Sequence, residues 1–105
     1  MAWIYLVLAG VCEIGWPIGL KLGWTEKGAR PLWILFAIAC MAVSGVLLLL
    51  AQRTIPMGTA YAVWTGIGAA GTFVAGLLLF GDATSAARLV SVGLIIAGVI
   101  GLKLG

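Results

Sequence analysis

The chain has 105 residues, of which 64% are hydrophobic and 9% are charged. A soluble domain carries about 25% charged residues, so this composition excludes an ordinary soluble protein. There is no histidine, and both cysteines, Cys12 and Cys40, lie in apolar stretches, so we expect no metal site, no disulfide framework and no cofactor. The net charge of +3 is spread along the chain, a pattern that does not indicate nucleic-acid binding.

The charged residues divide the chain into long apolar segments. They are Glu13, Lys21, Glu26, Lys27, Arg30, Arg53, Asp82, Arg88 and Lys103. Stretches of roughly 18 or more apolar residues are typical of membrane-spanning helices. We therefore expect an all-α membrane protein, a single four-helix transmembrane domain over residues 1–105, with spans at about 2–20, 32–51, 57–80 and 86–104.

The first predicted helix contains a carboxylate. Glu13 lies about ten residues into this span, near the bilayer midplane at ~15 Å depth. A charged side chain there costs at least ~2.5 kcal/mol on insertion scales, so it indicates a functional site. The alternative is a protonated, purely structural glutamic acid bonded between helices. Trp16 follows one turn later, and Pro17 conflicts with the helical hydrogen bond to the Glu13 carbonyl.

Polar and aromatic residues of the second and third spans are expected at a similar depth. Ser44, Tyr61 and Trp64 would meet Glu13 and Trp16 there, although the tryptophans could also be bulky packing residues. A carboxylate and aromatic faces attract a small cation, and Ser44 and Tyr61 would orient the carboxylate through hydrogen bonds. A planar guanidinium fits best, because its paired N–H groups match a carboxylate. Competition between a proton and a cation for one carboxylate is a sufficient basis for antiport.

Small residues indicate close helix packing and a bend. Gly66 and Gly68 predict a bend within the third helix. Small residues also recur at a spacing of four in two helices, and such stripes either let helices approach in a moving assembly or are merely structural. They are Gly58, Ala62, Gly66 and Ala70 in the third helix, and Gly93, Ala97 and Gly101 in the fourth. Four helices barely enclose a pathway and the sequence has no internal repeat, so a second subunit is expected.

The basic residues give a weak orientation signal. Arg53 and Lys103 would lie on the side of the N-terminus, and four basic residues would lie on the other: Lys21, Lys27, Arg30 and Arg88. By the positive-inside rule this places both termini outside. A bias this small is also compatible with insertion in both directions.

The chain resembles the small multidrug resistance family. The lone first-helix glutamate and the run Pro56-Met57-Gly58-Thr59-Ala60-Tyr61-Ala62-Val63-Trp64-Thr65-Gly66-Ile67-Gly68 carry this resemblance. The segment Glu13-Ile14-Gly15-Trp16, Lys21 and the ending Gly101-Leu102-Lys103 resemble its guanidinium exporter branch.

The resemblance implies an antiparallel homodimer with dual-topology insertion in the cell membrane, exporting guanidinium in exchange for protons by alternating access. It implies that Glu13 binds both substrate and proton, surrounded by Trp16, Ser44, Tyr61 and Trp64. It also implies a third helix that bends at Gly66 and Gly68, and fourth helices that carry the dimer contacts, which we assign to Gly93, Ala97 and Gly98.

Three functions remain open from the sequence. The first is a guanidinium/proton antiporter, which would also carry small substituted guanidinyl or quaternary ammonium cations. The second is a broad multidrug exporter that uses the same residues. The third is a non-transporting membrane subunit in which Glu13 is an interhelical contact. The sequence has no nucleophile–base pair or metal-binding cluster, so an enzyme is not expected. The expected partners are a small organic cation, protons, the lipid bilayer and a second copy of the chain.

Overall fold

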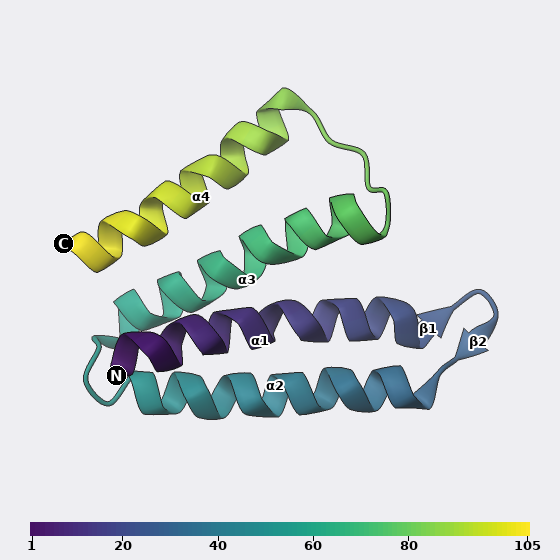
Figure 1. Ribbon diagram of the computed structural model, residues 1–105, viewed down its shortest axis with the longest axis horizontal. Helices are drawn as coiled ribbons and strands as arrows, with labels where there is room; N and C mark the ends of the chain where they lie inside the picture. The colour runs from purple at the N-terminus through teal and green to yellow at the C-terminus, as the bar shows by residue number, and fades with distance from the viewer.

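The computed structural model describes residues 1–105 as four long helices and a short hairpin (Figure 1). The helices are α1 (Ala2–Gly23), α2 (Pro31–Ala51), α3 (Met57–Leu79) and α4 (Ala86–Leu104), and all are long and apolar enough to cross a membrane. Such helices satisfy their own backbone hydrogen bonds in lipid. The predicted spans differ most at the end of α1, which reaches residue 23 instead of 20, and Pro17 lies inside α1 without ending it.

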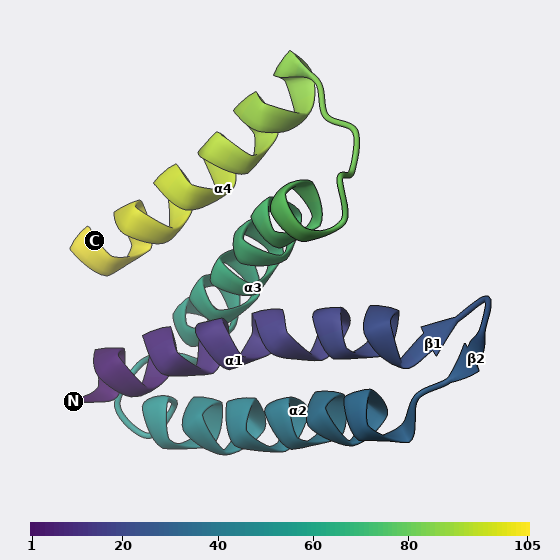
Figure 2. The same ribbon diagram turned by 45° about the vertical axis from the view of Figure 1, so that its right-hand side comes forward.

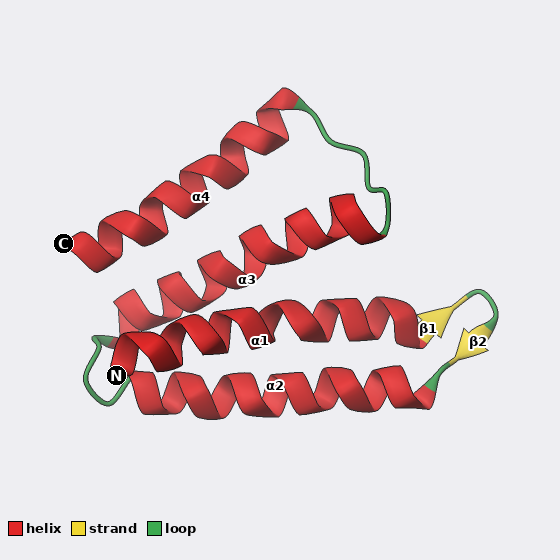
Figure 3. Cartoon of the chain, viewed as in Figure 1, coloured by secondary structure: helices red, strands yellow, loops and turns green.

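A two-stranded hairpin connects α1 to α2, where the sequence predicted only a connection (Figure 3). Its strands are β1 (Trp24–Thr25) and β2 (Gly28–Ala29), and they pair antiparallel. Gly28 has a φ of 109°, a conformation that favours glycine, and its carbonyl accepts a hydrogen bond from the Thr25 hydroxyl at 3.3 Å. Strands of two residues are too short for the alternation that reveals strands in a sequence.

Helices α1 and α2 run side by side along their whole length (Figures 1 and 2). Glycines of α1 make this approach possible. A methyl group added at Gly19 would lie 3.0 Å from Cβ of Ala37, and one added at Gly15 would lie 2.7 Å from Sγ of Cys40. Close backbone contact through small residues is a usual way for helices to associate in membranes.

Helix α4 stands apart from the other three helices (Figures 1 and 2). The buried core is a cluster contributed by α1, the end of α2, the turn after it and the start of α3: Leu6, Ala51, Ile55, Ala60 and Val63. In contrast, α4 has no buried residue. It approaches α3 where Val99 and Ile95 lie over Gly66. One face of α3 and much of α4 are therefore left without a protein neighbour.

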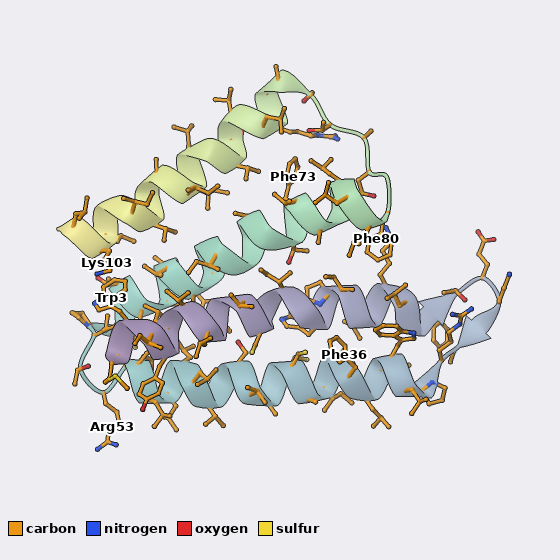
Figure 4. All side chains as sticks on the ribbon, in the orientation of Figure 1. Trp3, Phe36, Arg53, Phe73, Phe80 and Lys103 are labelled. Atoms are coloured by element: carbon orange, nitrogen blue, oxygen red, sulfur yellow. The ribbon has the colours of Figure 1, made fainter.

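The ends of the helix bundle carry different loops. Both termini and the α2–α3 connection lie at one end, and the hairpin and the α3–α4 connection lie at the other (Figure 1). Arg53 and Lys103 are both near the N-terminal end, as expected, where the Lys103 ammonium lies 4.9 Å from the ring centroid of Trp3 (Figure 4). At the opposite end Lys21 and Asp82 form a salt bridge of 3.7 Å. The structure thus agrees with the expected distribution of charge.

Candidate functional site

Glu13 lies on the wall of an open cavity of about 510 Å³ between α1, α3 and the α3–α4 connection. The side chain is partly buried, at the middle of α1. The cavity is lined by Glu13, Trp16, Pro17, Thr65, Gly68, Ala69, Thr72, Phe73 and Asp82. Glu13 is the one acidic residue within the four helices, since Glu26 and Asp82 lie in connections. A carboxylate at this depth thus faces a space large enough for a small molecule.

Trp16 is the hydrogen-bond partner of Glu13. Its indole N–H donates to Oε1 of the carboxylate, and residues three apart on a helix lie on one face. Pro17 has no N–H, so the backbone carbonyl of Glu13 lacks its usual helical partner. One turn of α1 therefore carries the Glu13 carboxylate, the Trp16 indole and a backbone carbonyl without a helical hydrogen bond.

Helix α3 forms the opposite wall, and Gly68 lies against Glu13. A methyl group added at Gly68 would be 2.6 Å from Cγ and 3.1 Å from Cβ of Glu13. Thr65 and Thr72 line the cavity from the same face of α3, as their spacing around residue 68 requires. From the sequence, Gly68 is expected only at a bend, Thr65 only as part of the third-helix motif, and Thr72 has no predicted role, although this spacing could have indicated both threonines. The helix is continuous through Gly66 and Gly68.

Ser44 forms a second polar group that joins three helices. It is fully buried in α2, and its hydroxyl donates to the backbone carbonyl of Ala9 in α1 at 2.7 Å. The indole N–H of Trp64 in α3 donates to the Ser44 oxygen at 2.8 Å. Ala9 is one turn before Glu13, so this link fixes α1 beside the cavity.

Tyr61 lies outside the cavity. Its side chain is 56% exposed, and its ring packs on Trp64 with centroids 5.4 Å apart. Within this chain the Ser44 hydroxyl donates to Ala9 instead of Glu13, and Tyr61 does not line the cavity, so a hydrogen bond of either residue to Glu13 stays a prediction. The structure therefore places Glu13 and Trp16 at one cavity and Ser44, Tyr61 and Trp64 beside it.

The residues expected to form dimer contacts do not line this cavity. Gly93 and Gly98 are on α4, and nothing lies within 4 Å of a methyl group added at either position. Ala97, on the same helix, is exposed. They are accessible for contact with another molecule.

Four helices long and apolar enough to cross a membrane, two of which enclose a cavity with the one carboxylate of the spans, are typical of a small multi-pass membrane transporter. The profile of the Small Multidrug Resistance protein family matches residues 1–95, and the chain belongs to this family. Family membership identifies it as a transporter and not an enzyme.

Proteins named guanidinium exporter are similar to this chain over almost its whole length. The protein of Citrobacter freundii is 54% identical over 104 residues, which cover 99% of this chain and 97% of the relative. The protein of Yersinia pseudotuberculosis is 51% identical over 99% of this chain and 98% of the relative. That of Salmonella typhimurium LT2 is 50% identical over 99% and 97%.

Proposed function

We propose that this protein exports guanidinium across the cell membrane in exchange for protons, with both ligands competing for Glu13. The observation that carries the proposal is the hydrogen bond from the Trp16 indole to the Glu13 carboxylate at the cavity wall. The similarity to proteins named guanidinium exporter supports the choice of substrate.

The chemistry of the cavity suits a guanidinium ion. Trp16 engages one carboxylate oxygen, Oε1, which leaves Oε2 and the remaining lone pairs for a planar cation approaching in the carboxylate plane. The indole face adds cation–π attraction. Thr65 and Thr72 supply hydroxyl oxygens that can accept the N–H groups not used by Glu13.

The exchange of guanidinium for protons follows from the location of the Glu13 carboxylate within the membrane. An ionised carboxylate within the membrane is unfavourable unless a cation or a proton neutralises it. Because Glu13 can be neutralised by one of them at a time, binding of a proton releases guanidinium and binding of guanidinium releases the proton. Each state is stable, whereas an empty, charged Glu13 is not, so the ligands move in opposite directions.

A second copy of the chain completes the pathway in this proposal. Helix α4 has no buried residue, and Gly93, Ala97 and Gly98 leave room for a closely approaching partner helix. An antiparallel homodimer would face two Glu13 side chains toward one pathway. Opposite orientation of two identical chains also supplies the inverted symmetry on which alternating access depends.

Transport of larger cations is the competing function, and the cavity volume of about 510 Å³ favours it. The test is uptake by proteoliposomes driven by a pH gradient, with guanidinium compared with tetraethylammonium. We expect guanidinium to be transported and tetraethylammonium to be poor, because the latter has no N–H group for Glu13. Equal transport of both would favour the multidrug function, and transport of neither would favour a non-transporting subunit.

A further inference from the structure

A second carboxylate borders the cavity that contains Glu13. Asp82, in the α3–α4 connection, lines this cavity at the end of the bundle that carries the hairpin. Its backbone N–H donates to the carbonyl of Gly76 at 3.0 Å, and its side chain lies so close to Gly76 that a methyl group there would collide with it. The backbone hydrogen bond therefore anchors residue 82 at the cavity edge, beside Gly76.

A cation already occupies the space next to Asp82. The Lys21 ammonium lies 3.7 Å from Oδ1 of Asp82 and 4.7 Å from the ring centroid of Phe80. Figure 4 shows Phe80 at the end of α3, beside the end of α1. A carboxylate next to an aromatic ring is the combination that Glu13 and Trp16 present deeper in the same cavity. The Lys21 ammonium thus lies where a free cation could bind, between a carboxylate and an aromatic ring like those of Glu13 and Trp16.

We propose that Asp82 and Phe80 form an outer cation site, at which guanidinium displaces the Lys21 ammonium on its way between the aqueous phase and Glu13. This inference rests on the proposed function and adds a second binding position to it. The side chains of Lys21 and Asp82 are 57% and 52% exposed, and ion pairs this exposed contribute little to stability, so the pair opens easily.

Guanidinium is better suited to this site than an ammonium. It can make two parallel hydrogen bonds to a carboxylate and stack its plane on a ring, whereas the Lys21 ammonium is a point charge. The other guanidinium group nearby belongs to Arg88, and it donates to the carbonyl of Ala83 at 3.2 Å. Arg88 forms no salt bridge with Asp82, so Lys21 is the competitor that an entering ion must displace.

The experiment measures the KM and maximal rate of guanidinium transport in proteoliposomes for Lys21→Met and Asp82→Asn. We expect Lys21→Met to lower KM and Asp82→Asn to raise it, each by about threefold to tenfold, because one removes the competitor and the other the acceptor. The control is Glu26→Gln, which removes an exposed carboxylate from the hairpin at the same end of the bundle. It should leave KM unchanged.

Whether KM rises or falls in Lys21→Met and in Asp82→Asn decides between the outer site and its alternatives. A purely structural ion pair predicts that Lys21→Met and Asp82→Asn shift KM in the same direction, and an effect of general surface charge predicts that Glu26→Gln resembles Asp82→Asn. Either result would overturn the outer site while leaving the proposed function intact, provided that the unmodified protein transports guanidinium. Failure of the unmodified protein to transport guanidinium would overturn the proposed function itself.

Equilibrium binding gives a second, independent measurement. In Glu13→Gln, weak guanidinium binding should persist at the outer site and should disappear when Asp82→Asn is added. Isothermal titration of the purified protein with guanidinium would detect both changes. Complete loss of binding in Glu13→Gln alone would contradict the outer site.

Discussion

Gly68 of α3 lies directly against the side chain of Glu13 of α1, and a methyl group at this glycine would be 2.6 Å from Cγ of the glutamate. The position of the carboxylate therefore depends on the absence of a side chain on the facing helix. This contact makes a glycine of α3 part of the binding geometry, in addition to any role in bending the helix.

Gly68→Ala should displace Glu13 and weaken guanidinium binding. We expect KM to rise about tenfold, since about 1.4 kcal/mol of lost binding free energy corresponds to that factor. The control is Gly45→Ala in α2, where nothing lies within 4 Å of the added methyl group. Both substitutions raise helix propensity equally. Equal KM values for the two variants would show that the contact does not position the carboxylate.

Glu13→Gln should abolish uptake driven by a pH gradient. The amide has a similar shape but neither ionises nor balances a cation, so it removes both the proton site and the counter-charge. Folding should be retained, because the Trp16 indole can still donate to the amide oxygen. Uptake by proteoliposomes and circular dichroism of the purified variant measure the two quantities. Normal pH-driven uptake by Glu13→Gln would exclude competition for this residue as the mechanism.

Trp16→Gly should lower the selectivity for guanidinium and admit larger cations. Loss of the indole removes the N–H donor to Glu13 and one wall of the cavity, so guanidinium is held less firmly while bulkier cations gain access. We expect slower guanidinium transport together with measurable transport of tetraethylammonium. Competition assays with both ions would report the change. An unaltered preference for guanidinium would assign selectivity to another part of the cavity.

The helices and the pair formed by Glu13 and Trp16 could be predicted from the sequence because both depend on local information. The length of an apolar stretch determines a span, and residues three apart on one helix share a face whatever the tertiary structure. Contacts between helices could not be predicted in the same way. These helices are apolar on nearly all sides, so their sequences give no signal for the face that packs inward.

Ser44 and Asp82 illustrate this limit. The depth of Ser44 was predictable, but its partner Ala9 contributes only a backbone carbonyl, which no side-chain pattern reveals. Asp82 reaches the cavity because the α3–α4 connection folds back through its hydrogen bond to Gly76. Loop conformations of this kind depend on contacts distant in sequence.

Ser44→Ala should destabilise the packing of α1, α2 and α3. It removes the acceptor for the Trp64 indole and the donor to Ala9, and side-chain hydrogen bonds in membrane proteins contribute about 0.6–1.7 kcal/mol each. The control is Ser91→Ala, because Ser91 donates to the Ala87 carbonyl at 2.8 Å within α4 but is exposed. Thermal unfolding in detergent should show a lower midpoint for Ser44→Ala. Equal midpoints would mean that the three-helix link contributes nothing measurable.

The last prediction concerns the orientation of the chain in the membrane. The hairpin and the α2–α3 connection lie at opposite ends of the bundle (Figure 1), and the basic residues are only weakly biased between these ends. An antiparallel homodimer requires both orientations in one membrane. Cysteines introduced at the exposed positions Ala29 and Thr54 leave every charge unchanged, and replacing Cys12 and Cys40 by alanine removes the native thiols.

With an impermeant maleimide added to intact cells, we expect Ala29→Cys and Thr54→Cys each to be labelled to about one half, with the remainder labelled after permeabilisation. The two fractions should be complementary, because each orientation exposes one end and hides the other. Adding a lysine to the α2–α3 connection should change the labelled fractions of Ala29→Cys and Thr54→Cys in opposite directions, one rising as the other falls. Leakage of the reagent would not produce this pattern, so the result distinguishes dual insertion from leakage. Complete labelling of one position and none of the other would contradict dual topology. In that case the pathway would require a different chain of opposite orientation.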